Sequence, residues 1–216
     1  MSQAAAKKIP LKQAQALGRR LIARFMPEGR EDEAHVAGSV RRCKAEVNDI
    51  ELILPWHDAA DDPVWRTMAP YIVARRDEGL FSPPDGPRPE LAWFDDLLGF
   101  KAGFLHTTLF CDPAVVWPTA RDFPAFKVDV YRYTPGPAGN FGSVMLVRTG
   151  PAQFGEAVMA WWKARGGRSE GNYFIDAADV KLPQDTEERA FALLGLEWVD
   201  PISRFDRDQL RARRGG

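Results

Sequence analysis

The chain has 216 residues, 45% hydrophobic and 27% charged, which is the balance of an ordinary globular protein. Its formal net charge is −1, so any nucleic-acid binding must use a local patch rather than a general excess of basic residues. Two cysteines, Cys43 and Cys111, exclude a disulfide framework and a four-ligand structural zinc site. The sequence shows neither a signal-peptide stretch nor a membrane-length apolar run, so we expect a cytoplasmic protein with no membrane partner.

Apolar spacing and chain breakers predict alternating helices and strands. A first helix is expected from Pro10, with apolar residues three and four apart, and Pro27 ends it. The further expected elements, in chain order, are a strand over 34–37, a short helical stretch from Gly38, a strand over 47–54, a helix over 63–76, a loop over 82–89, strands over 100–110 and 125–133, a Pro- and Gly-rich loop over 134–140, a short strand over 143–147, a helix from Pro151 to Gly166, and a last helix from Asp185 or Thr186 to Leu194.

Acidic residues in two of these strands give the strongest chemical signal. Side chains alternate along a strand, so Asp49 and Glu51 project from one face, about 7 Å apart at the backbone. Acidic residues are depleted from strands, and like charges held together favour a bound cation such as Mg²⁺. Asp129, on the strand over 125–133, would supply a third carboxylate for a two-metal centre. The alternative is that these acids lie on a solvent-exposed strand face.

A glycine and a serine precede the paired acids by ten residues. Gly38 and Ser39 follow a strand and open a helical stretch, where free backbone N–H groups suit a phosphate. Gly38 would allow close approach of the backbone, Ser39 would donate a hydroxyl, and Arg42 would provide a charged fork. Alone, however, a Gly-Ser pair is also an ordinary helix start.

Taken together, these motifs resemble a known family. The segments 37–42 and 48–51 resemble the G-S-x-R-R…G-D-[IM]-[DE] motif of family X DNA polymerases, the polymerase-beta-like nucleotidyltransferases. The segment 127–130 is similar to their third-carboxylate strand, 148–150 to their Thr-Gly turn, and 187–199 to a segment near their C-terminus. The Asp-Ile-Glu and Arg-Thr-Gly forms are closest to the short versions found in phages and prophages.

The resemblance implies an α+β fold, with a nucleotidyltransferase palm (a mixed sheet with flanking helices) over 10–140 and a small thumb over 141–216. Asp49, Glu51 and Asp129 would hold two Mg²⁺ or Mn²⁺ ions and carry catalysis. The implied nucleotide-binding residues are Gly38, Ser39, Arg42, Arg148, Thr149 and Gly150. The implied reaction adds a nucleotide from an NTP or dNTP to a 3′-hydroxyl and releases pyrophosphate. The expected partner is primed or gapped DNA, as in DNA repair, and a monomer is expected.

Departures from the family pattern leave other functions open. Cys43 and Asn48 stand where the family has glycines, and Val147-Arg148 replaces an aromatic pair that helps select the sugar. The modules with which larger relatives grip duplex DNA are not visible. An untemplated nucleotidyltransferase acting on RNA, protein or a small molecule is therefore an alternative, as is a catalytically silent nucleic-acid-binding module. His35, His57 and His106 lack a second ligand at zinc-like spacing, so they are read as ordinary structural histidines.

Overall fold

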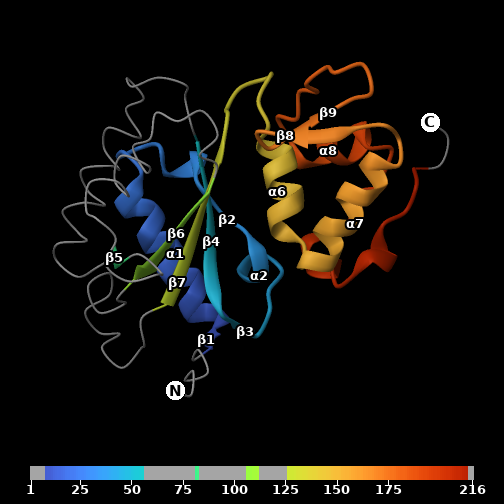
Figure 1. Cartoon of the computed structure of the whole chain (residues 1–216). Helices are drawn as coiled ribbons and strands as arrows, with labels where there is room; N and C mark the ends of the chain where they lie inside the picture. The colour runs from blue at the N-terminus through green and yellow to red at the C-terminus, as the bar shows by residue number, and fades with distance from the viewer. Residues whose placement is uncertain (1–7, 56–80, 83–105, 112–125, 214–216) are drawn as a thin grey trace.

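The chain forms a central sheet with helices against it, followed by a mainly helical C-terminal part (Figure 1). The computed structural model describes residues 8–55, 81–82, 106–111 and 126–213. Its helices are α1 (Leu11–Phe25), α2 (Gly38–Arg41), α6 (Phe141–Thr149), α7 (Ala152–Lys163) and α8 (Glu187–Leu193), with short 3₁₀ turns at Glu31–Glu33, Pro201–Ser203 and Arg207–Gln209. The expected α+β class is confirmed.

The strands form one larger sheet and two small ones. They are β1 (Ile9–Pro10), β2 (His35–Val36), β3 (Glu46–Val47), β4 (Asp49–Pro55), β5 (Phe81–Ser82), β6 (His106–Cys111), β7 (Phe126–Tyr133), β8 (Arg168–Glu170) and β9 (Tyr173–Ile175). The larger sheet has the order β2-β4-β7-β6-β5, and only its central pair, β4 and β7, is parallel. The strands β1 and β3 pair with each other, as do β8 and β9.

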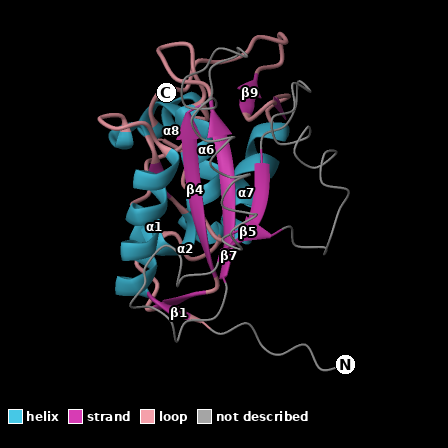
Figure 2. Cartoon of the chain, turned by 90° about the vertical axis from the view of Figure 1, so that its left-hand side faces the viewer, coloured by secondary structure: helices cyan, strands magenta, loops and turns pink. Residues whose placement is uncertain are grey.

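The two faces of the larger sheet have different coverings. On one face, alternate residues of β4 and β7, including Ile50, Leu52 and Val128, pack against the apolar stripe of α1 (Figure 2). Gly18 allows this close approach, because a Cβ there would lie 2.9 Å from Val36 Cγ2. The opposite face contacts α2 and α6, so the acidic side chains of β4 and β7 lie on the side away from α1.

Helix α6 corrects the short strand that the sequence predicts over 143–147. Its side chains are buried on two sides: Val144 and Met145 pack with Tyr131 of the sheet, whereas Leu146 packs with Phe154 in the C-terminal part. This double burial gives a continuous apolar run, which periodicity alone does not distinguish from a strand.

The other elements largely follow their predictions. The first helix, the strand over 125–133 and the last helix are confirmed, and Thr186 caps the last helix by accepting a hydrogen bond from the Arg189 amide. The strand predicted over 47–54 is divided at Asn48, because β3 pairs with β1 instead of continuing in the larger sheet. The predicted helix over 63–76 and the segments 83–89 and 100–105 lie outside the described residues. The division into palm and thumb domains stays a prediction.

None of the helices in the described ranges combines the length and apolar character that crossing a bilayer requires.

Candidate active site

The parallel pairing of β4 and β7 brings the three predicted carboxylates together. In this register Glu51 lies directly opposite Asp129, and Asp49 lies opposite Lys127. Directly paired residues share a face of the sheet, so all three acids project from the face away from α1. Asp129 is only 5% exposed. Alternation along each strand predicts which acids share a face. The register of β4 against β7 then brings the three carboxylates together.

A lysine side chain lies between two of these acids. The ammonium of Lys127 is 2.9 Å from Asp49 Oδ2 and 2.7 Å from Asp129 Oδ2. Burial acts to lower the pKa of Lys127, but hydrogen bonds and charge attraction from Asp129 and Asp49 outweigh it and raise the pKa. The sheet thus holds a positive charge between the two carboxylates, and Lys127 was not identified as a site residue from the sequence.

The third carboxylate of the cluster, that of Glu51, has a raised pKa. Burial, followed by repulsion from Asp49 and Asp129, raises the pKa of Glu51 to about 7, although Arg42 and Arg148 act in the opposite direction. Additional cationic charge would stabilise the ionised form of Glu51. Among the described residues, no group of three or more His, Cys, Asp and Glu side chains is arranged to hold a metal ion. Carboxylate oxygens are the donor type that a hard divalent cation prefers, and here the Lys127 ammonium bridges two of the three carboxylates.

The turn at the start of α2 lies directly against this cluster. Gly38 has a φ of +61°, and a Cβ built on it would lie 1.4 Å from Glu51 Oε2. The adjacent Ala37 amide donates to the Glu51 carbonyl oxygen at 2.8 Å. A glycine is therefore required both by the backbone conformation and by the position of the Glu51 side chain.

We expect Gly38→Ala to damage binding at the cluster more than it damages folding. The new methyl group must displace the Glu51 carboxylate, so binding of a divalent cation with nucleotide should weaken at least about tenfold, equivalent to ~1.4 kcal/mol. The matched control is Gly29→Ala, which has a similar φ of +83° but nothing within 4 Å of its Cβ. Calorimetric titration of both variants tests this, and equal binding by the two would contradict it.

Two polar groups of the predicted phosphate turn remain without partners. The Ser39 hydroxyl and the Arg42 Nε are buried and have no hydrogen-bond partner in the described structure. The Arg42 guanidinium also donates through Nη1 to the Thr149 carbonyl oxygen. Buried polar groups are normally satisfied, so this turn retains donors for a ligand.

In the predicted Thr-Gly turn, Thr149 accepts hydrogen bonds from both Arg41 and Arg42. Thr149 is fully buried at the end of α6, and its hydroxyl accepts a hydrogen bond from Arg41 Nη1 at 2.8 Å. A Cβ on Gly150 would lie 2.5 Å from the ring of Phe154, so close packing against α7 requires that glycine. The structure thus brings Thr149 to the two arginines of the phosphate turn.

Arg148, in the last turn of α6, contacts the strand β7 that carries Asp129. Its guanidinium lies over the Tyr131 ring, 4.1 Å from the centroid, and its charge opposes the raised pKa of Glu51. On the neighbouring strand β6, His106 stacks on the same tyrosine and places its Nε2 3.0 Å from Asp129 Oδ1. No spacing pattern in the sequence points to His106, because this contact depends on the pairing of β6 with β7.

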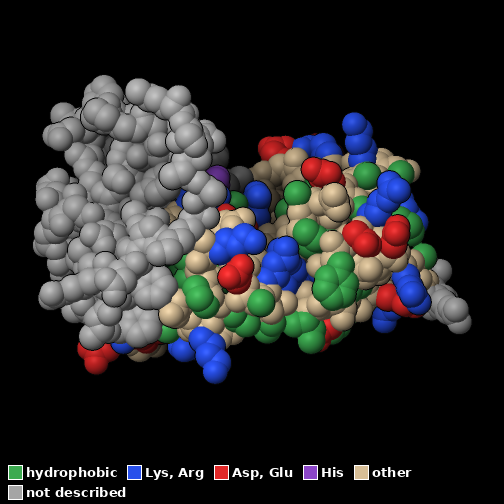
Figure 3. All heavy atoms as spheres, turned by 90° about the horizontal axis from the view of Figure 1, so that it is seen from below, with side chains coloured by type: hydrophobic (Ala, Val, Ile, Leu, Met, Phe, Trp, Pro, Cys, Tyr) green, Lys and Arg blue, Asp and Glu red, His purple; other side chains and the backbone are tan. Residues whose placement is uncertain are grey.

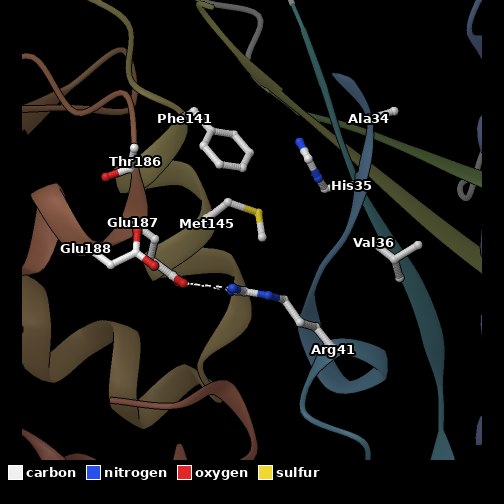
Figure 4. Close-up of a pocket in the computed structure, with 9 residues that line it drawn as sticks. All are labelled: Ala34, His35, Val36, Arg41, Phe141, Met145, Thr186, Glu187 and Glu188. Carbon is white, nitrogen blue, oxygen red and sulfur yellow. Dashed lines mark hydrogen bonds and ion pairs between the residues drawn. The ribbon is translucent and has the colours of Figure 1, made fainter. Parts of the chain in front are cut away.

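An ion cluster joins the end of α2 to the C-terminal part, with Glu187 and Arg204 buried and Arg41 partly exposed. Glu187 of α8 accepts hydrogen bonds from Arg41 at 3.0 and 2.8 Å and from Arg204 at 2.6 Å. Burial acts to raise the pKa of Glu187, but these hydrogen bonds outweigh it and lower the pKa. Figure 4 shows Arg41 pointing toward Glu187. Both residues line a groove of about 490 Å³, together with His35, Phe141 and other residues. We found no sequence signal for the pairing of these distant residues.

The two departures in the family motif have different structural consequences. Cys43 adopts a φ of +56°, a conformation that favours the glycine usual at that position. Asn48 is not among the described residues with positive φ, so it does not use the tolerance of asparagine for that conformation. The turn is therefore retained at Cys43 at the cost of some backbone strain.

Comparison with protein-family models returns no match, and comparison with curated proteins returns none either. The function of this chain is therefore inferred from the chemistry of its carboxylate cluster and of the turn at Gly38.

Proposed function

We propose that the chain is a metal-dependent nucleotidyltransferase, and specifically a minimal DNA polymerase of the family X type. The observation that carries the proposal is the ammonium of Lys127 held between Asp49 and Asp129, with Glu51 directly across the strand pair. An enzyme that transfers nucleotides needs such a cation-holding cluster beside a site for a triphosphate. The unpartnered donors of Ser39 and Arg42 support the second requirement.

In the proposed reaction, a hydroxyl oxygen attacks the α-phosphorus of a nucleoside triphosphate and loses its proton to solvent, while the bond to the bridging oxygen breaks to release pyrophosphate. Asp49, Glu51 and Asp129 would hold Mg²⁺ or Mn²⁺, which when bound neutralises phosphate charge and lowers the pKa of the attacking hydroxyl. Ser39 and Arg42 would bind the triphosphate through hydrogen bonds. Asp129 would also orient the hydroxyl, and Lys127 keeps the carboxylates of β4 and β7 together.

Incorporation assays test this proposal. The full chain is incubated with Mg²⁺ or Mn²⁺, each labelled NTP or dNTP in turn, and either gapped DNA or single strands. We expect labelling only with the deoxynucleotide or ribonucleotide that pairs with the template base, and none with the Asp129→Asn variant. Labelling that ignores the template would overturn the polymerase assignment, and no labelling of either acceptor would contradict it.

The charge distribution favours one alternative, an untemplated transferase acting on RNA, protein or a small molecule. The formal net charge is −1, and Figure 3 shows Lys and Arg side chains interspersed with Asp and Glu side chains over the described part of the lower face. A continuous basic surface for duplex DNA is not seen on that face. Equal labelling of single-stranded and gapped acceptors in the same assay would support this alternative.

The position of Arg148 predicts weak discrimination between sugars. Arg148 stands at the sequence position of a family aromatic residue, and its guanidinium lies over the Tyr131 ring, from where its donors would contact a ribose hydroxyl. We expect the ratio of deoxynucleotide to ribonucleotide incorporation to change about tenfold in Arg148→Phe, equivalent to ~1.4 kcal/mol. The matched control is Arg165→Phe, since Arg165 also stacks on an aromatic ring, that of Trp161, in the C-terminal part. An unchanged ratio in Arg148→Phe would remove Arg148 from the nucleotide site.

A further inference from the structure

We propose that the exposed face of helix α1 binds the phosphate backbone of duplex nucleic acid. Helix α1 covers the side of the larger sheet away from the acids, so this surface lies apart from the carboxylate cluster (Figure 2). The inference does not rest on the proposed nucleotide transfer. It assigns a binding role to charges that neither the fold nor that reaction uses.

The charged residues of α1 all have the same sign and all are exposed. They form the basic face of the helix, which consists of Lys12, Arg19, Arg20 and Arg24. The helix contains no acidic residue, although the whole chain has a formal net charge of −1. At a rise of about 1.5 Å per residue, Lys12 and Arg24 are about 18 Å apart along the helix. The basic face is therefore an extended row of positive charge on a chain whose remainder is net negative.

Folding does not account for these charges. Arg20 and Arg24 are four residues apart, a spacing at which like charges on a helix repel each other. Lys12 lies in the first turn, where the helix dipole disfavours a cation. Solvated helices typically alternate basic with acidic residues, but Lys12, Arg19 and Arg24 form no ion pair in the described structure. An anionic partner would offset the repulsion within this face.

A hollow beside the basic face has the size and the donors for a phosphate group. It has a volume of about 250 Å³ and lies between α1 and α2, where Gln15, Arg19 and Arg41 help to line it. Arginine binds phosphate oxygens through charge-assisted hydrogen bonds. Arg41 is already paired with Glu187, whereas the guanidinium of Arg19 makes no hydrogen bond among the described residues. Arg19 thus keeps its donors for a ligand at the edge of this hollow.

The uncharged residues of the same face favour duplex nucleic acid as the partner. Ala16 and Ala23 lie between the charges and are small, so a nucleic-acid backbone can come close to the helix. Proteins that bind single strands without sequence preference use exposed aromatic side chains, and the one aromatic residue of α1, Phe25, is buried. A membrane surface calls for exposed apolar residues, but the apolar face of α1 is buried against the sheet.

The test measures binding of the full chain to a short labelled duplex of mixed sequence by fluorescence anisotropy, with EDTA present to remove divalent ions. The affinity should fall steeply with added salt, because each phosphate contact releases counterions. In Lys12→Gln/Arg19→Gln/Arg24→Gln, binding at low salt should weaken at least about tenfold, and the slope of log affinity against log salt should fall by about 2 to 3. A second duplex of unrelated sequence should give the same result, because phosphate contacts carry no sequence information.

Two further variants separate the basic face from general charge. The matched control, Lys163→Gln/Arg207→Gln/Arg211→Gln, removes three exposed cations from the C-terminal part and so gives the same net charge. It should bind within about twofold of the wild type, because exposed charges far from the contact are screened. The variant Arg19→Lys/Arg24→Lys keeps the charges on α1 and should keep the salt dependence.

Several outcomes would overturn the inference. Equal weakening in the two triple variants would show that binding follows net charge, and binding that is insensitive to salt would exclude phosphate contacts. Loss of binding to anionic lipid vesicles in the α1 variant, with duplex binding unchanged, would assign the basic face to a membrane surface. The incorporation assay reports on the proposed function separately: nucleotide transfer without binding through α1 would leave that function standing, and binding through α1 without transfer would leave this inference standing.

Discussion

Asp129→Asn is expected to reduce the rate of nucleotide transfer by at least about 1,000-fold, while nucleotide binding stays near that of the parent. Asparagine keeps the shape of the side chain but removes the charge that would hold the catalytic ion and orient the hydroxyl. A loss of ~4 kcal/mol in transition-state stabilisation corresponds to this factor. Asp129 is 5% exposed and its oxygens contact Lys127 and His106, so the neutral amide has little freedom to recruit other groups.

The informative comparison is with Asp49→Asn. Asp49 is paired with the same lysine, but it lies beside Glu51 on β4 and should also serve the ion that accompanies the triphosphate. This second variant should therefore lose both affinity and rate. Single-turnover rates and calorimetric titration with Mg²⁺-nucleotide separate the two effects. Normal turnover by Asp129→Asn would make Asp129 an ordinary strand residue and would defeat the proposal of three catalytic carboxylates.

The features of this site that were predictable from the sequence are those that depend on residues close together in the chain. Alternation along a strand places Asp49 and Glu51 on one face wherever that strand lies, because the period of two is a property of the backbone. The insertion of Lys127 between two acids depends on the register of β4 against β7, strands more than 70 residues apart in sequence. No local pattern encodes that register, and the same holds for the contact between His106 and Asp129.

The secondary-structure elements also differ in how far neighbouring residues alone predict them. Helix α1 was predictable because one face is apolar and the other charged. Helix α6 was read as a strand, since it is buried between two apolar clusters and has no polar face to reveal its period. The hairpin of β8 and β9 was missed although its signal was present. Gly171 and Asn172 both have positive φ, as a two-residue turn between short strands requires.

The ion cluster around Glu187 gives the largest expected effect on stability. Glu187 is 4% exposed and Arg204 is 1% exposed, and the carboxylate is the partner that offsets the burial of the Arg204 charge. Removing one partner of a buried ion pair leaves an uncompensated charge and costs about 3–5 kcal/mol. We therefore expect Glu187→Gln to lower the free energy of unfolding by about this amount, as measured by urea denaturation at neutral pH. The control is Glu188→Gln, an exposed neighbour on α8.

The pH dependence of this loss of stability shows whether the charge of Glu187 or its packing is the cause. The pKa of Glu187 is lowered in the folded protein below its ordinary value of 4.5, so its contribution to stability is complete above that value and is lost as the pH falls through the folded pKa. In acid the wild-type side chain is protonated and resembles glutamine. The difference in unfolding free energy between the wild type and Glu187→Gln should therefore shrink steadily below pH 4.5. A difference that persisted undiminished in acid would mean that Glu187 stabilises the fold by packing, and that its charge does not hold Arg41 and Arg204 in place.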